Sequence, residues 1–502
     1  MKNKILLLLS AVLMLTACDG FLDLSPKHKW DMESAISSYS SAQQAVNGIY
    51  GATLLGDDLN ASLNTAYCSR SGLVKTDQNE YDFAYTQSNS PSGLWQKCYI
   101  GVNACNLAIS QIPLVSDSSF PTATAKEELI AEARFLRGYF NSILMINYCH
   151  WWEKNVESPY GIIYRSEMTT PDNAYQPRIS VGDSWIKIFD DIDYGIEKMS
   201  DTFVSNRKVS KIFAKAWKAK LLMIRGWNGD YSTAAKLVDQ CIAALPAAGI
   251  SMQADMAKHF EESWDSKENI FVRYLNDDGK RTSNAGYWTE YGPAYSLGDD
   301  CVIASSGVET LQSEVACGLR YGVDWMHADP RWYISTGRAR NPETWDNTES
   351  WTWTKIYRKG RVAGQQDPVD EKYATYYMRV PELYIMKAEL LAHSGASYKD
   401  AIAPINEMRA KRTNPVLDPL PTPANEQEMW DFIFQEYVKE LILENGCEYW
   451  ASLRIKKDGV TYMEHIKGAD YTHNQTKLQY PIPNDEMINN PQVEGMQNPD
   501  QE

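Results

Sequence analysis

The sequence predicts a mostly helical protein, built from helical hairpins, with long irregular insertions and only minor β-structure. Three observations favour this fold class. Apolar residues recur at helical spacing in several separated segments, two of these segments share one local pattern, and the stretch 276–370 between them has no sustained helical period. Because the faces of such hairpins are buried only by stacking neighbours, we expect a single body of successive hairpins.

The first 17 residues have the features of a secretory signal peptide, with two lysines ahead of an apolar core over residues 5–15. This core is shorter than the roughly 18–20 residues that span a bilayer. Small residues then precede Cys18 in the order Leu-Thr-Ala-Cys, which resembles the lipobox of bacterial lipoproteins. The resemblance implies that Cys18 is acylated and becomes the mature N-terminus, with 18–31 as a lipidated leader and 32–502 as the body. An ordinary signal peptide with a chance cysteine is the alternative.

Helical spacing starts at residue 32 and is strongest over residues 127–148. The apolar stripe of that segment recurs at spacings of three and four and is formed by Leu129, Ala133, Leu136, Phe140 and Leu144. Further helices are predicted near 94–107, 181–199 and 211–225. A Gly-, Asn- and Ser-rich stretch, 57–92, interrupts the pattern. The predicted helical scaffold therefore covers about 32–56, 93–275 and 371–456.

Two segments, 211–245 and 377–412, have the pattern of helical hairpins. The first turns at Trp-Asn-Gly-Asp and the second at Ser-Gly-Ala-Ser, and each turn is followed by a tyrosine, a small residue three positions later and an aliphatic residue four positions after that. These positions are Tyr231, Ala234 and Val238 in one copy and Tyr398, Ala401 and Ile405 in the other. Such spacing favours close packing of paired helices, as in tetratricopeptide-type repeats.

The stretch 276–370 is rich in Gly, Asn, Thr and Asp, and it contains six of the sixteen tryptophans of the chain. A final pair of helices is predicted over 428–444 and 447–456, ahead of an irregular tail. Four tryptophans lie instead on helical stripes, where core packing is the expected role: Trp95, Trp185, Trp217 and Trp450.

The charge balance argues against nucleic acid and anionic lipid surfaces as partners. Without Lys2 and Lys4 the chain has 47 basic and 65 acidic residues, a net charge of −18. The eight cysteines after Cys18 form no CxxC pair, so most of them are interpreted as buried small hydrophobic residues. Cys301 and Cys317 lie in the irregular stretch, where a disulfide between them is an alternative.

Several motifs, in this order along the chain, resemble those of the SusD/RagB family of outer-membrane lipoproteins of Bacteroidetes. They are Leu94-Trp95 with Tyr99-Ile100 and Asn103-Ala104, the helix Ala131-Glu132-Ala133-Arg134-Phe135-Leu136-Arg137-Gly138-Tyr139, the short strand Asn269-Ile270-Phe271, the run Arg379-Val380-Pro381-Glu382-Leu383-Tyr384, and the ending Tyr480-Pro481-Ile482-Pro483-Asn484 with Gln497-Asn498-Pro499. Two positions depart from the family pattern, because Tyr437 stands where Arg is common and Ser452 where Asp is common. These departures place a local charge network in doubt.

The resemblance implies a scaffold of about four tetratricopeptide-like hairpins and a partner, a SusC-type TonB-dependent transporter that receives the captured nutrient. It also implies that the ligand site lies in insertions corresponding to about 57–92 and 276–370. The candidate ligand-binding residues are Tyr67, Asp77 and Tyr81 in the first insertion and Trp288, Tyr291, Trp325, Trp345 and Trp351 in the second. We expect about a third of these loop aromatics to contact ligand and the others to pin their loops to the scaffold.

Indole and phenol rings suit sugars, because they stack on the C–H face of a pyranose while nearby polar groups pair with its hydroxyls. The expected function is capture of oligosaccharides or polysaccharide at the cell surface, without catalysis and without a cofactor. A peptide-capturing member of the same family is the alternative, and a surface glycosidase is a third hypothesis.

No catalytic or metal-binding pattern favours an enzyme. The seven histidines are dispersed without HExxH, no Gly-rich phosphate loop or GxSxG appears, and no metal site is predicted, although calcium binding stays open. The acidic run Asp190-Asp191-Ile192-Asp193 is interpreted as a solvated helix face, with Phe189, Ile192 and Ile196 as the buried stripe. Glu132, Arg134 and Arg137 are interpreted as an ion-pair network that supports the scaffold.

Overall fold

A computed structural model describes residues 36–50, 59–73, 78–272, 325–326, 328–335, 337–340, 349–352, 355, 374–468, 477–499 and 501. The predicted signal peptide, the leader with Cys18, and both Cys301 and Cys317 lie outside these residues. Within them, no helix is both long enough and apolar enough to cross a membrane.

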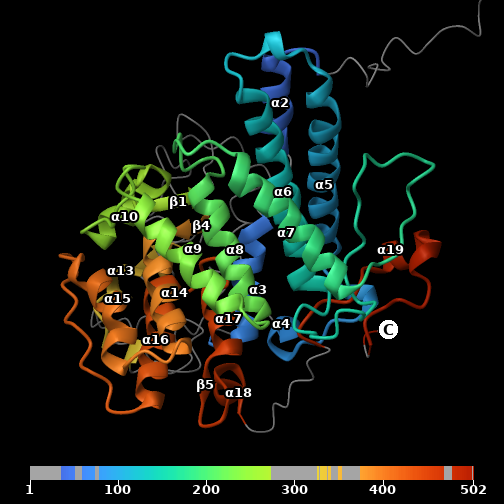
Figure 1. Ribbon diagram of the computed structural model, residues 1–502. Helices are drawn as coiled ribbons and strands as arrows, with labels where there is room; N and C mark the ends of the chain where they lie inside the picture. Colours follow the sequence, from blue (N-terminus) through green and yellow to red (C-terminus); the bar gives the residue numbers. More distant parts are fainter. Residues whose placement is uncertain are drawn as a thin grey trace, which may run out of the picture.

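The N-terminal half is a layer of packed helices, α2 (Tyr39–Tyr50), α5 (Ser92–Gln111), α6 (Ala125–Tyr148) and α7 (Val181–Lys198), which lie side by side (Figure 1). Helix α6 packs against the other three, so it is buried along almost all of its C-terminal half. Gly138 lets α7 approach closely, because a Cβ at this position would lie 2.9 Å from Ile192. The predicted helices of this half are confirmed.

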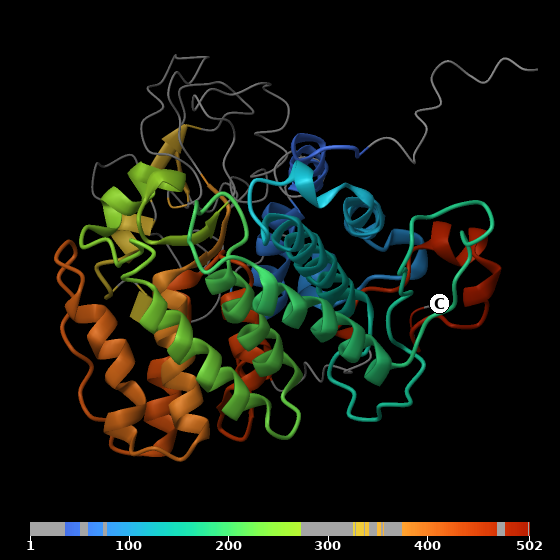
Figure 2. The ribbon, with the colours of Figure 1, turned by 45° about the horizontal axis from the view of Figure 1, so that its top comes forward.

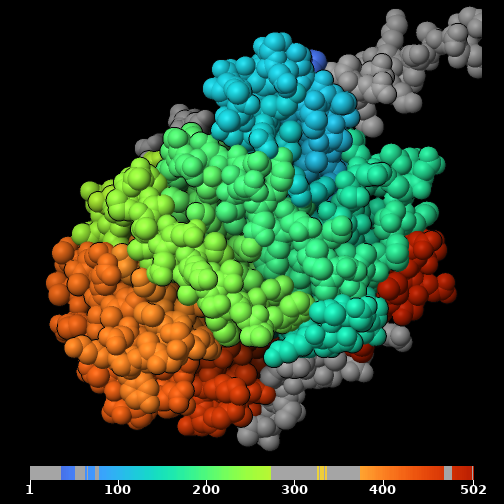
Figure 3. Space-filling model, viewed as in Figure 1, coloured from blue at the N-terminus to red at the C-terminus, as the bar shows by residue number. Residues whose placement is uncertain are grey.

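Both predicted hairpins are present, α8 (Lys211–Arg225) with α9 (Asp230–Ala244) and α14 (Val380–His393) with α15 (Tyr398–Ala410). Helix α9 packs on α14, so the two hairpins stack and form one continuous surface (Figure 3). The small and aliphatic residues of the repeated pattern are fully buried in both copies. The aromatic position differs, since Tyr231 stacks on His393 at 4.1 Å whereas Tyr398 is 39% exposed.

The C-terminal scaffold continues with α16 (Glu426–Leu441) and α17 (Cys447–Arg454), close to the predicted bounds. Shorter elements are α4 (Gln78–Asp82), α10 (Met256–Glu262), α13 (Trp332–Ser335), α18 (Tyr462–Lys467) and α19 (Asn484–Asn489), and the 3₁₀ turns Gln87–Asn89, Ile112–Leu114, Asp117–Ser119, Ser263–Asp265 and Pro491–Val493. Together these elements confirm a mostly helical fold.

The strands are few and short. β1 (Asn269–Val272) pairs antiparallel with β4 (Tyr376–Arg379), which places the two ends of the predicted second insertion beside each other. β2 (Gly337–Arg340) pairs with β3 (Glu349–Thr352) inside that insertion, and β5 (Lys456–Lys457) pairs with β6 (Val460–Thr461). The strand predicted at Asn269-Ile270-Phe271 is therefore confirmed.

Helix α3 (Leu59–Ser71) was not anticipated, because it lies inside the segment 57–92 that breaks the helical pattern. Its sequence is rich in Asn, Ser and Thr and shows no strong apolar stripe. Leu63, Tyr67 and Cys68 are nevertheless buried, and the helix packs against α17. Tertiary packing therefore stabilises a helix that local propensity does not predict.

The C-terminal tail returns to the N-terminal helices and closes the core. The Tyr480 amide donates to the Asn147 carbonyl at 2.6 Å, and the Asn498 side chain donates to the Tyr148 carbonyl at 2.9 Å. Arg178 donates to the side chain of Asn498 at 2.8 Å, so the tail lies against the loop that precedes α7 (Figure 2). The residues of the closing signature are therefore structural.

The predicted roles of the helical tryptophans are confirmed, since Trp95, Trp185, Trp217 and Trp450 are all in the core. Six cysteines are also buried free thiols, as expected of small core residues: Cys68, Cys98, Cys105, Cys149, Cys241 and Cys447.

Two electrostatic expectations are corrected. Asp190 and Asp193 face solvent, but Asp191 is only 1% exposed and accepts from Arg134 at 2.8 Å and from Arg137 at 2.7 Å. The acidic run is therefore not a uniformly solvated face, because arginines of the neighbouring helix bind its middle carboxylate.

Glu132 is the second correction, since it is not a partner of Arg134 or Arg137 in an ion-pair network. Its carboxylate accepts instead from the hydroxyl of Tyr50 at 2.6 Å and lies 3.7 Å from the Lys208 ammonium.

Candidate functional site

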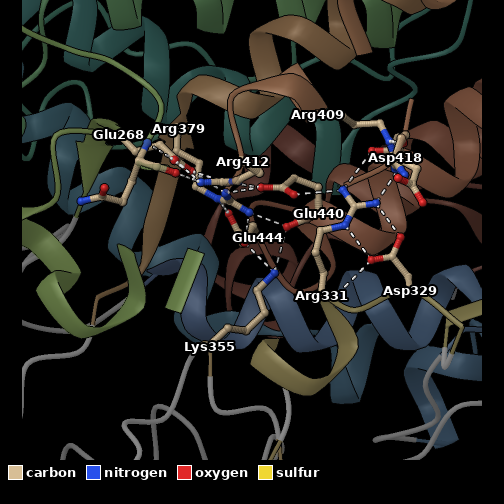
Figure 4. Close-up of polar contacts among 12 residues, drawn as sticks. Glu268, Asp329, Arg331, Lys355, Arg379, Arg409, Arg412, Asp418, Glu440 and Glu444 are labelled. Atoms are coloured by element: carbon tan, nitrogen blue, oxygen red, sulfur yellow. Dashed lines mark hydrogen bonds and ion pairs between the residues drawn. The ribbon is translucent and has the colours of Figure 1, made fainter. Parts of the chain in front are cut away.

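Ten charged side chains form a buried ion cluster at the base of the predicted second insertion (Figure 4). Its members come from the residue before β1, the ends of β4 and α15, α16, the turn after it, and the insertion itself: Glu268, Asp329, Arg331, Lys355, Arg379, Arg409, Arg412, Glu436, Glu440 and Glu444. Five acids face five bases, so the cluster is neutral in formal charge.

Glu440 lies at the centre of this cluster. Its carboxylate accepts from Arg331 at 3.0 Å, from Arg379 at 2.7 Å and from Arg412 at 2.6 Å, and none of these side chains is exposed. The position follows from helix geometry, since Glu436 and Glu440 are four residues apart on one face of α16. Like charges at that spacing repel, and cations from other segments separate them here.

The arginines hold Glu268 and Glu440 in the ionised state. Burial by itself would raise the pKa of Glu268, but Arg412, His259 and Arg379 lower it to about 2. The pKa of Glu440 likewise falls well below its usual range, because three arginines outweigh the effect of burial. Carboxylates paired in this way are poor candidates for general acid or base chemistry, which requires a proton that can be exchanged near neutral pH.

Two cations of the cluster belong to the predicted second insertion. Arg331 donates to Glu436 and to Glu440 of α16, and Lys355 lies 2.6 Å from the carboxylate of Glu444. Both side chains are fully buried, and Trp332 beside Arg331 is buried as well. The described base of the insertion is therefore fixed to the helical scaffold by charge-assisted contacts.

The departures from the family pattern do not remove the charge network near α17. Tyr437, in place of a common Arg, donates from its hydroxyl to Glu389 at 2.8 Å, and Arg454 binds the same carboxylate through two nitrogens. Burial opposes ionisation of Glu389, but Arg454 holds its pKa far below the usual range. Ser452 donates to the carbonyl of Tyr449 within its own helix. The network in doubt is therefore intact.

Tyr67, a candidate of the first insertion, lies in the core on α3. It is 3% exposed, its hydroxyl donates to Asn147 at 2.9 Å, and its ring stacks on Tyr449 at 5.3 Å. No face of this ring is open to solvent, so in the described fold Tyr67 supports the core.

Tyr81 lies at the end of α4 and is half-buried. The ammonium of Lys467 lies 4.7 Å from its ring and 4.1 Å from the ring of Phe83, and it donates to the Tyr81 carbonyl at 2.5 Å. Burial, together with the charge of Arg70, lowers the pKa of Lys467 to about 6. These contacts attach the first insertion to α18.

Trp325 is half-buried, with the ammonium of Lys439 5.4 Å from its ring. Because Lys439 belongs to α16, Trp325 lies at the base of the second insertion. Trp351 lies in β3, but its side chain is outside the described residues, as are Asp77, Trp288, Tyr291 and Trp345. Their ligand contacts stay predictions.

Arg331 and Lys355, which support the site, were not predicted from the sequence. One signal was present, since Glu436, Glu440 and Glu444 recur every four residues over the predicted helix 428–444, and such a row of acids requires cations from elsewhere. Which cations would supply them could not be seen, because Arg331 lies 105 residues from Glu436 and 109 residues from Glu440 along the chain. Among the described residues no group of His, Cys, Asp and Glu is arranged to hold a metal ion.

Comparisons with known families cover nearly the whole chain. A model of the SusD family matches residues 228–500, and a SusD-like model described as starch-binding and associating with the outer membrane matches residues 20–223. The chain is 22% identical to a SusD-like protein of Bacteroides ovatus over 95% of this chain and 85% of that protein. It is also 22% identical to SusD-like protein P2 of Formosa agariphila, over 82% of each chain.

Solved structures share the fold. A SusD superfamily protein from Bacteroides thetaiotaomicron matches with a TM-score of 0.66 and 16% identity, over 92% of this chain and all of that one. The surface glycan-binding protein A from Bacteroides fluxus matches with a TM-score of 0.65 and 18% identity, over 93% of this chain and all of that one.

Proposed function

This chain belongs to the SusD/RagB family, and from that premise we propose that it binds oligosaccharides at the outer membrane and performs no chemistry on them. The family descriptions that match it speak of starch binding and of association with the outer membrane. A similar fold is also found in a protein described as a surface glycan-binding protein.

The observation that carries the proposal is the firm attachment of the Trp-rich insertion to the scaffold. Fully buried ion pairs tie its base to the scaffold, from Arg331 to α16 and from Lys355 to Glu444 in the turn after α16. A loop that presents aromatic rings binds best when its support is rigid, because less conformational freedom is lost on binding. The predicted contacts are stacking by tryptophans such as Trp288 and Trp351, with hydroxyls paired by neighbouring polar groups.

The absence of catalysis is part of the proposal. Hydrolysis of a glycoside usually needs two carboxyl groups, one of which carries an exchangeable proton. The five acids of the buried ion cluster are each engaged by cations and are closed to solvent, and this supports binding over hydrolysis.

Delivery to a transporter and lipid anchoring are the finer parts of the proposal. An acylated Cys18 would hold the leader at the outer membrane, and a SusC-type TonB-dependent transporter would receive the captured oligosaccharide. The test compares wild-type cells with cells carrying Cys18→Ala. Binding by the purified body should be unchanged and cellular uptake impaired, whereas normal uptake without the cysteine would argue against anchoring.

The binding experiment uses the purified mature protein and calorimetry with amylopectin, laminarin, xylan and mannan, beside a pool of basic and neutral peptides. We expect binding to at least one glycan, no release of reducing ends, and loss of binding in Trp288→Ala or Trp351→Ala. Val204→Ala, on an exposed residue of the scaffold, is the control. Binding to peptides alone would favour the peptide-capturing alternative, which the net charge of −18 would suit. Release of reducing ends would favour the glycosidase.

A further inference from the structure

The turn between α16 and α17, residues 443–446, has a strained backbone. Leu443, Asn445 and Gly446 have positive φ angles of 63°, 50° and 62°. Residues other than glycine rarely adopt this region, and it persists only where the surrounding structure determines it. Gly446 adopts this region freely, whereas Leu443 and Asn445 do so at a cost, so the turn is a place where contacts compete with local preference.

On one side, the 443–446 turn holds the second insertion. Glu444 lies 2.6 Å from the ammonium of Lys355 and accepts from Arg379 Nε at 2.6 Å, with all three side chains buried. Lys355 also donates to the carbonyl of Glu440, and its backbone amide donates to Ser335 within the insertion.

On the other side, the same turn holds α3, which belongs to the predicted first insertion. The backbone amide of Asn445 donates to the side-chain oxygen of Asn64 at 2.8 Å. Gly446 lies against the ring of Tyr67 so closely that a Cβ would approach it to 2.4 Å. No larger residue fits there without moving α3.

Asn445 is also bound from the scaffold. Its side-chain nitrogen donates to the carbonyl of Tyr377 in β4 at 2.8 Å, and its own carbonyl accepts from Lys220 of α8 at 2.9 Å. The backbone and side chain of one buried residue therefore connect α3, β4 and α8, while its neighbour Glu444 connects to the second insertion.

We propose that the 443–446 turn sets the position of the two predicted ligand-binding insertions relative to each other, with Glu444 and Asn445 as positioning residues. Because the strained backbone is held from both sides, loss of a contact on one side allows it to relax and weakens the contacts on the other side. The importance of this coupling for ligand rests on the proposed function, but the coupling itself is a property of the free protein.

The test is hydrogen–deuterium exchange of the mature protein without ligand. Lys355→Met removes the contact to the second insertion, and Asn64→Ala removes the acceptor on α3. We expect each variant to speed exchange on its own side of the turn and also on the opposite side. For Lys355→Met the opposite side is represented by peptides of residues 59–71, and for Asn64→Ala by peptides of residues 325–335. The effect should be about tenfold, the order expected when a buried polar group loses its partner.

Arg137→Met is the matched control, because it removes another buried ion pair, between α6 and Asp191 of α7. It should speed exchange in α6 and α7 and leave both insertions unchanged. The proposal is overturned if Lys355→Met and Asn64→Ala each speed exchange on their own side only, or if Arg137→Met speeds exchange in both insertions as much as they do.

Titrations of the same variants with amylopectin and laminarin separate this proposal from the proposed function. If no glycan binds but exchange is still faster on the opposite side of the turn, only the proposed function is contradicted. If glycan binds but exchange on the opposite side is unchanged, only the coupling is contradicted.

Discussion

Replacing Glu440 by glutamine tests whether the buried ion cluster stabilises the fold. The substitution keeps the shape of the side chain but removes the one charge shared by Arg331, Arg379 and Arg412. Four acids then face five bases, and one arginine charge is left buried without compensation. Loss of one partner from a buried ionic network costs about 3–5 kcal/mol.

That cost can be converted into a melting temperature. At about 2.1 cal/mol/K of unfolding entropy per residue, a chain of 502 residues loses about 1 °C of Tm per kcal/mol. Glu440→Gln should therefore lower the Tm by about 3–5 °C in differential scanning calorimetry of the mature protein. The control is Glu426→Gln, an exposed acid in the first turn of the same helix, for which we expect a change below about 1 °C.

A second variant makes the reasoning sharper. Combining Glu440→Gln with Arg412→Met restores the balance at four acids and four bases, so part of the lost stability should return. If Glu440→Gln melts within about 1 °C of the wild type, or if the double variant is less stable than the sum of the single effects, charge balance does not govern the cluster.

Burial raises the pKa of Glu448 from 4.5 to about 7, so the folded state loses stability as the pH rises from about 4.5 to 7. In urea titrations, the contribution of this group to the free energy of unfolding should fall by about 3 kcal/mol between pH 5 and pH 8, and Glu448→Gln should remove that difference. If the variant keeps the same difference, the burial of Glu448 does not cause it. Glu268, whose pKa is lowered to about 2, acts in the opposite direction. The stabilisation by ionised Glu268 is complete above pH 4.5 and is lost as the pH falls toward 2. Glu268→Gln should therefore make acid unfolding, followed by circular dichroism, less steep with pH. An equally steep curve would count against the ion pairs of Glu268. Gly446→Ala should cost about 2–5 kcal/mol, because its Cβ meets the Tyr67 ring at 2.4 Å. Gly229→Ala, with φ +85° and open space around it, should cost only about 1 kcal/mol in the same urea titration, and equal losses would contradict the steric argument.

Local pattern was sufficient for the helices that carry one apolar face. The stripe from Leu129 to Leu144 predicts α6, and the small residues Ala234 and Ala401 predict how each hairpin packs. Local pattern was insufficient for α3. Its residues Tyr67 and Cys68 have polar neighbours in the sequence, and they are buried by α17, which is almost 400 residues later in the chain. Such a helix has no stripe of its own to detect.

Charged residues were harder to predict than apolar ones. The sequence around Asp191 reads as a solvated acidic run, because the arginines that bury it are on another helix. The same holds for Arg331, which lies in an irregular stretch and is paired with acids about 105 residues later. Of the candidate ligand residues, Tyr67, Tyr81 and Trp325 have described contacts within the protein. The ligand contacts of the other tryptophans depend on loops whose geometry no local pattern fixes.

The return of the C-terminal tail to the first helices has a consequence for biogenesis. Gln497 contacts Gln87 across 410 residues of sequence, and Tyr480 and Asn498 complete the hydrogen bonds at the end of α6. Contacts of such long range form late, since most of the chain must first be present. The N-terminal half therefore cannot reach its final packing while the last residues are still being synthesised. Final packing of the N-terminal helices is thus held back until the tail arrives.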